Sequence, residues 1–342
     1  MSRLDVVLSA DFLSESGALI FPDISLDSIA GHPQIAHRFL PDYQAEYTPG
    51  QLAEADVVLS LKPKVTAASL EGVSRLCAIG RFGVGYDNVD TAACTEADVA
   101  VYITRQAVVR PVASSIVLLV LAAAHNLVSK DRLLRRGEWA ASTRALGKEP
   151  RGRVLGTVGL GNIAREALRL LVPFGFAEFL AYDPVVEAAE GVRMVDLETL
   201  FAESDFVLIN CPLTPQTRGL VSDSLLRRMK SDAVLVNTAR GPIVDEAALT
   251  AVLQEGRIKC AALDVFEKEP LAVDSPLLGL ENTILTSHSL CWTEELFRDM
   301  GREAFAGVLA VGRGLAPANV VNPEVLTRPG FLKKLERLGG TL

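Results

Sequence analysis

Cysteine and histidine are both scarce in this chain of 342 residues, which contains five cysteines and four histidines. The cysteines are Cys77, Cys94, Cys211, Cys260 and Cys291; no two of them form a CxxC pair, and their number is odd. This spacing argues against both a disulfide framework and a zinc site. We therefore expect no bound metal and a reducing compartment.

The chain also lacks a long apolar run and an excess of positive charge. Its most apolar stretch, Ile116 to Ala124, is too short to span a bilayer. Acidic residues interrupt the N-terminus, where a signal peptide needs an apolar core. The net charge of −8 leaves no general basic footprint for nucleic acid. These absences predict a cytoplasmic protein without a membrane or nucleic-acid partner, although a small anionic substrate needs only a local cluster of Lys or Arg.

Short apolar runs of strand type alternate with longer helical patterns, which is typical of βαβ units and parallel sheets. The predicted fold class is α/β, with two Rossmann-like doubly wound parallel-sheet domains and an interdomain cleft. The predicted strands are Val6–Leu8, Val57–Leu61, Cys77–Ile79, Val99–Ile103, Val154–Val158, Phe179–Tyr182, Phe206–Ile209, Ala233–Val236, Ala261–Leu263 and Thr283–Leu285.

Two changes of pattern suggest where the domains meet. One lies near Arg110 and Pro111, before an apolar helix predicted over Val112–Asn126, and the other lies between Trp292 and Glu303. We therefore expect one domain over residues 112–296. Residues 1–111 and 297–342 would together form the other domain, so that the chain passes between the domains twice.

A glycine-rich turn follows the predicted strand Val154–Val158. Gly159, Gly161 and Ala164 occupy the small-residue positions of a GxGxxA pattern. The first allows a tight turn, the second lets the backbone approach a pyrophosphate, and the third lets the next helix pack closely. The helical pattern over Ile163–Leu171 would direct its N-terminal amides at a phosphate. The segment is therefore a candidate dinucleotide site.

Asp183 ends the next predicted strand, 22 residues after Gly161. A carboxylate at this distance accepts hydrogen bonds from the adenosine ribose hydroxyls and repels a 2′-phosphate, which favours NAD over NADP. The alternative is a glycine turn that binds no ligand. The strand, the helix and the spaced acid together favour the NAD site. The domain over residues 112–296 is therefore predicted to be the NAD-binding Rossmann domain, and residues 1–111 and 297–342 the substrate-binding domain.

Three further segments, over residues 236–246, 262–270 and 285–290, contain groups suited to chemistry on a 2-oxo acid. Its reduction needs a hydride donor, a proton donor and a cation for the carboxylate. His288 follows a buried-type strand and can donate a proton near neutral pH. Glu269 can stabilise its cationic form, and the guanidinium of Arg240 can hold a carboxylate. Each residue alone also fits a loop, a turn or a surface ion pair.

In their order and spacing these segments resemble the D-isomer-specific 2-hydroxyacid dehydrogenases, over roughly Val57 to Glu303. Residues 81–90 and 204–219 match further segments of that family. The resemblance implies that Arg240, Glu269 and His288 are catalytic. It also implies that Asp264 holds the nicotinamide carboxamide.

The resemblance assigns the remaining site residues by position. The backbone amides of Val84 and Gly85 would bind the substrate carboxylate with Arg240, and Lys62 aligns loosely with a basic position that contacts anionic substrates. The full predicted cofactor-binding set is Gly159, Gly161, Asn162, Ile163, Asp183, Cys211, Pro212, Thr217, Thr238, Ala239, Arg240, Asp264 and His288.

The chain departs from the family pattern before the apolar helix. Val108, Pro111 and Ser114 replace the usual Asn, Ser and Glu, and Arg105 and Arg110 are additional cations. These changes leave the identity of the substrate open, but not the type of reaction.

We therefore predict hydride transfer between NAD(H) and a small 2-hydroxy or 2-oxo acid, in a homodimer that uses the apolar helix and residues 136–139 as its interface. The alternative is an NAD-sensing interaction protein resembling the C-terminal-binding corepressors, suggested by Trp292. A formate dehydrogenase is not expected, because that enzyme would carry Gln at the position of Glu269.

Overall fold

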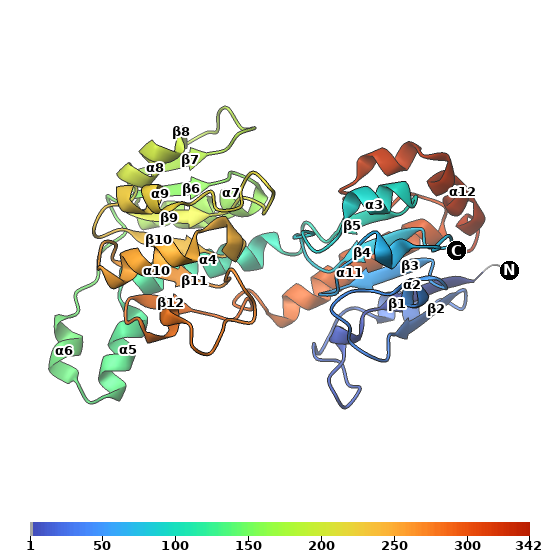
Figure 1. Cartoon of the computed structure of the whole chain (residues 1–342), viewed down its shortest axis with the longest axis horizontal. Coiled ribbons are helices and arrows are strands. Elements are labelled where there is room, and N and C mark those ends of the chain that lie inside the picture. Colours follow the sequence, from blue (N-terminus) through green and yellow to red (C-terminus); the bar gives the residue numbers. More distant parts are fainter. Residues whose placement is uncertain (1–2) are drawn as a thin grey trace. The chain divides into compact units, whose positions relative to one another are not determined.

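A computed structural model describes residues 3–342. The chain forms two compact units. Unit 1 combines the residues up to Val108 with Trp292–Leu342, and unit 2 consists of Val109–Cys291. Each unit is built around its own parallel sheet (Figure 1).

Unit 2 contains a seven-stranded sheet in the order β12-β11-β10-β9-β6-β7-β8, and all neighbouring strands in it are parallel. Its strands are β6 (Val154–Val158), β7 (Glu178–Tyr182), β8 (Arg193–Met194), β9 (Phe206–Ile209), β10 (Val234–Asn237), β11 (Cys260–Leu263) and β12 (Thr283–Leu285). Its helices are α4 (Val109–Ala124), α5 (Leu127–Arg135), α6 (Trp139–Arg144), α7 (Asn162–Leu171), α8 (Leu197–Glu203), α9 (Asp223–Arg228) and α10 (Glu246–Gln254).

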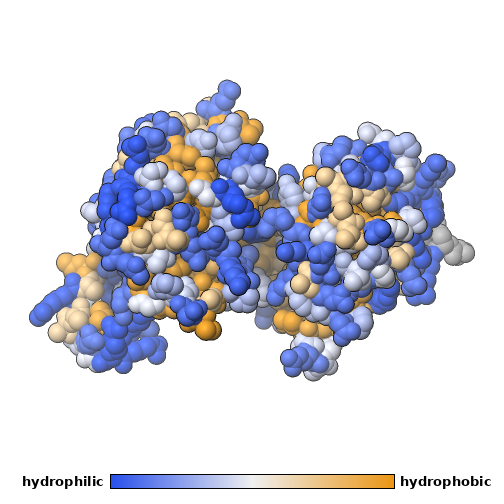
Figure 2. Space-filling view, in the orientation of Figure 1, coloured by the Kyte–Doolittle hydropathy of each residue, from blue (hydrophilic) through white to orange (hydrophobic). Residues whose placement is uncertain are grey.

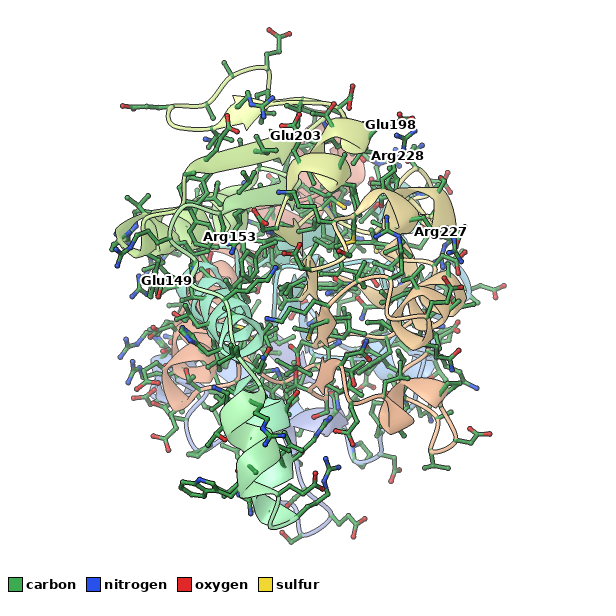
Figure 3. All side chains as sticks on the ribbon, turned by 90° about the vertical axis from the view of Figure 1, so that its left-hand side faces the viewer. Glu149, Arg153, Glu198, Glu203, Arg227 and Arg228 are labelled. Atoms are coloured by element: carbon green, nitrogen blue, oxygen red, sulfur yellow. The ribbon has the colours of Figure 1, made fainter. Side chains whose placement is uncertain are left out.

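Helices cover both faces of this sheet, which explains why its strands are continuous apolar runs rather than alternating ones. Buried side chains of α4 and α7 form one core with one face of the strands, and those of α8, α9 and α10 form a second core with the other. On the outer surface, Glu198 of α8 and Arg228 of α9 lie side by side, 2.8 Å apart (Figure 3).

The strand order reverses between β6 and β9. The chain leaves β6 towards β7 on one side, and returns later to β9 on the other. In open α/β sheets, ligands bind beyond the carboxyl ends of the strands at such a switch point. The glycine turn after β6 and Cys211 after β9 therefore lie where a ligand site is expected.

Unit 1 contains a five-stranded parallel sheet in the order β2-β1-β3-β4-β5. Its strands are β1 (Leu4–Leu8), β2 (Ile35–Phe39), β3 (Val57–Ser60), β4 (Ala78–Arg81) and β5 (Ala100–Ile103). Its helices are α1 (Asp27–Ala30), α2 (Pro49–Leu52), α3 (Thr91–Glu96), α11 (Glu294–Gly312) and α12 (Pro329–Leu338).

The structure confirms the α/β class and the parallel sheets, and it adds two strands that the sequence did not predict. These are β2, with the sequence IAHRF, and the two-residue β8. Both lie at a sheet edge, where polar side chains replace the apolar run that identifies a central strand. Helix α4 begins at Val109 rather than Val112, because Pro111 is tolerated within the first turn of a helix.

No single helix among the described residues is long and apolar enough to cross a membrane. Helices α4 and α5 pass that test of length and composition only as a pair, and the pair is bent by 59°.

In unit 1, a buried carboxylate connects the N-terminal strand β1 with the C-terminal helix α12. The Asp56 side chain is fully buried, and it accepts hydrogen bonds from Arg75 (2.8 Å), from Arg337 of α12 (2.8 Å) and from the backbone N–H of Asp5 (2.8 Å). Burial alone would raise the pKa of Asp56, but these partners outweigh it and lower the pKa. The sheet and the C-terminal helix therefore depend on one ionised group.

We predict that Asp56→Asn destabilises unit 1 by about 2–3 kcal/mol, because it weakens charge-assisted hydrogen bonds to a buried acceptor. This loss of unfolding free energy should reach its full size at a pH above the ordinary pKa of an aspartic acid. It should become smaller as the pH falls through the lower pKa that Asp56 has in the folded protein. Urea unfolding at pH 7 and at pH 3 measures both effects. Asp131→Asn, which breaks an exposed pair with Arg135, serves as the control. Equal midpoints for the two variants at pH 7 would contradict the prediction.

Candidate active site

The glycine turn after β6 has the backbone that a dinucleotide site needs. Gly159 has a φ of 93°, and a Cβ at this position would lie 2.8 Å from the backbone nitrogen of Cys211. Only glycine therefore fits between the ends of β6 and β9. The space beside Gly161 is open, because a Cβ added to this residue would have no atom within 4 Å.

Helix α7 begins at Asn162, directly after this turn, and no side chain caps its first N–H groups. Uncapped amides at a helix N-terminus, together with the helix dipole, bind an anion such as a pyrophosphate. The open space at Gly161 leaves room for it. Gly159, Gly161, Asn162 and Ile163 thus fit the cofactor that the sequence predicted.

Asp183 lies beside the same turn, after β7. One carboxylate oxygen accepts the N–H of Leu160 (2.8 Å), and the other accepts the N–H groups of Val185 (2.9 Å) and Val186 (3.1 Å). Burial would raise the pKa of Asp183, but these backbone hydrogen bonds outweigh it and lower the pKa. The group is a fixed negative charge at neutral pH. Its role in holding the glycine turn was not evident from the spacing alone.

The loop after β9 carries the predicted Cys211, Pro212 and Thr217. The Thr217 hydroxyl donates to the carbonyl of Pro212 (2.6 Å), and its backbone N–H donates to the hydroxyl of Thr214 (3.2 Å), so the loop is held by its own side chains. Burial raises the pKa of the Cys211 thiol to about 11. Cys211 is thus a protonated, unreactive side chain at neutral pH.

Arg240 follows β10, beyond the partly exposed Thr238 and Ala239. The buried Asn237 amide accepts the N–H of Ala239 (3.0 Å) and donates to the carbonyl of Arg240 (3.0 Å), which fixes the backbone of this turn. The next residue is Gly241, where a Cβ would overlap the carbonyl carbon of Phe266 at 1.8 Å. Glycine therefore allows the Arg240 turn to pack directly against the loop that carries Glu269.

Glu269 and His288 form a hydrogen-bonded pair. Glu269 Oε2 lies 2.7 Å from His288 Nδ1, and Glu269 Oε1 accepts the backbone N–H of Phe266 (3.0 Å). Burial alone would raise the pKa of Glu269, but the hydrogen bond and charge of His288 lower it. His288 has a φ of 54°, an uncommon conformation for a residue with a side chain, and such outliers cluster at functional sites.

Asp264 holds the loop on which His288 lies. Its Oδ1 atom accepts the hydroxyl of Thr286 (2.6 Å) and the backbone N–H groups of Ser289 (3.2 Å) and Leu290 (3.3 Å). Asp264 is 3% exposed, so these bonds are shielded from water. The sequence indicated a cofactor contact for Asp264 but not this second role. Thr286, two residues before the histidine, was the available signal.

The predicted substrate residues Lys62, Val84 and Gly85 belong to unit 1, at the carboxyl edge of its sheet. Lys62 follows β3 and is exposed, and Val84 and Gly85 are partly exposed in the turn after β4. The buried Thr104 holds that turn: its hydroxyl accepts the N–H of Gly83 (2.8 Å), and its own N–H donates to the carbonyl of Gly83 (3.1 Å). The backbone amides after Gly83 are therefore presented on a fixed turn.

Comparison with known proteins agrees with this geometry. The family model described as "D-isomer specific 2-hydroxyacid dehydrogenase, NAD binding domain" matches residues 117–289. Its span lies within unit 2, which contains all the residues predicted to bind the cofactor.

Relatives of known activity match across both units. A glyoxylate reductase of Korarchaeum cryptofilum is 38% identical over 82% of this chain and 87% of its own length. A D-3-phosphoglycerate dehydrogenase of Methanocaldococcus jannaschii is 40% identical over 80% of this chain, which spans about half (52%) of that longer protein. The crystal structure of a glyoxylate reductase from Paecilomyes thermophila superposes with a TM-score of 0.80 at 26% identity, covering 94% of this chain and 99% of that one.

The relatives are enzymes, so the alternative of an interaction protein is not favoured. The chain belongs to the D-isomer specific 2-hydroxyacid dehydrogenase family, and it is an oxidoreductase that acts on 2-hydroxy and 2-oxo acids with a nicotinamide cofactor.

Proposed function

We propose that the protein is an NAD-dependent reductase of small 2-oxo acids such as glyoxylate, with unit 2 binding the cofactor and unit 1 binding the substrate. The observation that carries this proposal is the His288–Glu269 pair, on a loop held by Asp264 in the same unit as the glycine turn. Unit 2 thus contains both a candidate proton donor and a candidate dinucleotide site.

In unit 1, the amides of Val84 and Gly85 and the positive charge of Lys62 are suited to a substrate carboxylate. In unit 2, the guanidinium of Arg240 is suited to the same kind of group. When bound, the nicotinamide ring supplies the hydride that is transferred to C2 of the substrate. Negative charge then develops on the C2 oxygen. Arg240 stabilises this charge, and His288 donates a proton to that oxygen from Nε2, because its Nδ1 atom is occupied by Glu269.

Glu269 orients the imidazole through its hydrogen bond to Nδ1. It can do this because its second oxygen is fixed to the backbone of Phe266, which prevents the carboxylate from rotating. In the oxidative direction the same pair accepts the proton from the hydroxyl group.

We further infer that the protein works in the cytoplasm. All five of its cysteines are free thiols, and three of them are buried, as expected for a protein from a reducing compartment.

The pair predicts a graded loss of activity. His288→Ala should lower kcat for 2-oxo acid reduction by about 10²–10⁴-fold, the usual contribution of a general acid. Glu269→Gln should lower kcat by less, because the proton donor remains but loses the carboxylate that orients it. Both are measured with glyoxylate and NADH, with Glu267→Gln, an exposed neighbour, as control. An unchanged kcat in His288→Ala would show that another group supplies the proton.

Asp183 predicts a preference for NADH over NADPH. Its ionised carboxylate should repel the 2′-phosphate, and Asp183→Ala should weaken NADH binding about 10- to 100-fold, in line with the loss of charge-assisted hydrogen bonds. Fluorescence titration with both cofactors measures the effect. Glu187→Ala, which removes an exposed acid four residues later, should change nothing. Equal affinity of the unmodified protein for the two cofactors would refute the preference.

The exposed apolar side chains around helices α5 and α6 favour a homodimer. Leu134 of α5 (51% exposed) and Trp139 of α6 (69%) are large exposed apolar side chains, as is Leu146 (79%) just after α6, and orange atoms appear on this part of the molecule in Figure 2. Apolar patches on a surface mark protein interfaces. Sedimentation at micromolar concentration should give a dimer that Leu134→Ser weakens. Leu332→Ser, an equally exposed leucine on α12, should leave it intact. A monomeric unmodified protein would overturn the proposal.

A further inference from the structure

The two cations that depart from the family pattern, Arg105 and Arg110, have different surroundings. Arg110 of α4 donates to Glu166 of α7 at 3.0 Å, and Glu166 also binds Arg169 through both of its oxygens. These arginines lower the pKa of Glu166 to about 2, so the carboxylate stays ionised and offsets the charge of Arg110. Arg110 is therefore part of an ion pair between two helices.

Arg105 has no such partner among residues 3–342. Its side chain is exposed, and no hydrogen bond or ion pair joins its guanidinium to another described residue. An unpaired cation on the surface is common, but the backbone on both sides of this one is held by hydrogen bonds.

The backbone is fixed on both sides of Arg105. On one side Thr104 is bound to Gly83 through its hydroxyl (2.8 Å) and its N–H (3.1 Å). On the other side the N–H groups of Gln106 and Ala107 donate to the carboxylate of Glu303 (both at 3.1 Å), which also accepts from Asn319 (2.7 Å). Because the backbone is already fixed, only the Arg105 side chain has to be ordered when it binds an anion.

This position is next to the proposed substrate turn. Strands β4 and β5 are parallel neighbours, and Thr104 after β5 is hydrogen-bonded to Gly83 after β4. Arg105 and Val84 are each one residue beyond that contact, at the same edge of the sheet. Lys62 lies at the same carboxyl edge, after β3, where the side chain of Asn88 holds its carbonyl at 3.0 Å. Two exposed cations therefore flank a turn whose amides are suited to one carboxylate.

We propose that Arg105 is a specificity-determining residue that binds a second anionic group on the substrate, and that the preferred substrates are 2-oxo acids with two negatively charged groups. The proposal rests on the function proposed above. The second group is a carboxylate or a phosphate, since a guanidinium forms charge-assisted hydrogen bonds with either.

The test compares kcat/KM for matched pairs of substrates. Oxaloacetate is compared with pyruvate for a second carboxylate, and 3-phosphohydroxypyruvate with hydroxypyruvate for a phosphate. Arg105→Gln should lower kcat/KM about 10- to 100-fold for the doubly charged member of the preferred pair, and should leave the singly charged member nearly unchanged. Arg105→Lys should retain part of the preference. Arg110→Gln is the control, because Arg169 still holds Glu166.

Salt supplies a second readout. Raising ionic strength should reduce the preference for the doubly charged substrate in the unmodified enzyme, and should have little effect on it in Arg105→Gln. An equal loss on all substrates in Arg105→Gln, or an unchanged ratio within both pairs, would overturn the assignment while leaving the proposed reaction intact. Failure of the unmodified enzyme to reduce any of the four acids, while it reduces glyoxylate, would overturn this inference alone. Failure to reduce glyoxylate as well would overturn the proposed function and this inference together.

Discussion

The parallel direction of the strands in unit 2 is the constraint on which the rest of the site depends. Because β6, β9, β10, β11 and β12 all run the same way, the loops that follow them end at one edge of the sheet. Those loops carry the glycine turn, Cys211, Arg240, Asp264 with Glu269, and His288 in that order. The direction of the strands therefore places the glycine turn and His288 at the same edge of the sheet, although they are more than a hundred residues apart in the chain.

Carboxylates then fix the loops at that edge. Asp183 binds three backbone N–H groups beside the glycine turn, Asp264 binds two in the His288 loop, and Glu269 binds one at Phe266. Glu303 acts in the same way in unit 1. Backbone donors in loops lack the partners that helices and sheets provide, and an ionised oxygen forms a stronger hydrogen bond with them than a neutral one does. These acidic residues therefore give the loops a defined conformation.

The sequence predicted the central strands, and it singled out candidate site residues, for physical reasons. Strands buried on both faces are apolar runs, and the GxGxxA turn with Asp183 has one geometry that suits a dinucleotide. It could not predict β2, whose edge position allows His37 and Arg38, or β8, which is only two residues long. It also could not show that Arg110 is paired while Arg105 is not, because that difference depends on the packing of α4 against α7. The close approach of Gly241 to Phe266 likewise depends on how two loops meet.

The central claim is that unit 2 assembles a hydride-transfer site with its proton donor. Transfer of deuterium tests it most directly. The protein is supplied with glyoxylate and with NADH that carries deuterium at the transferred position of C4, and the product is examined by mass spectrometry and NMR. The account predicts glycolate with one deuterium on C2 and no exchange of that deuterium with water. Deuterium that remains in the cofactor, or that is lost to solvent while glycolate forms, would contradict it.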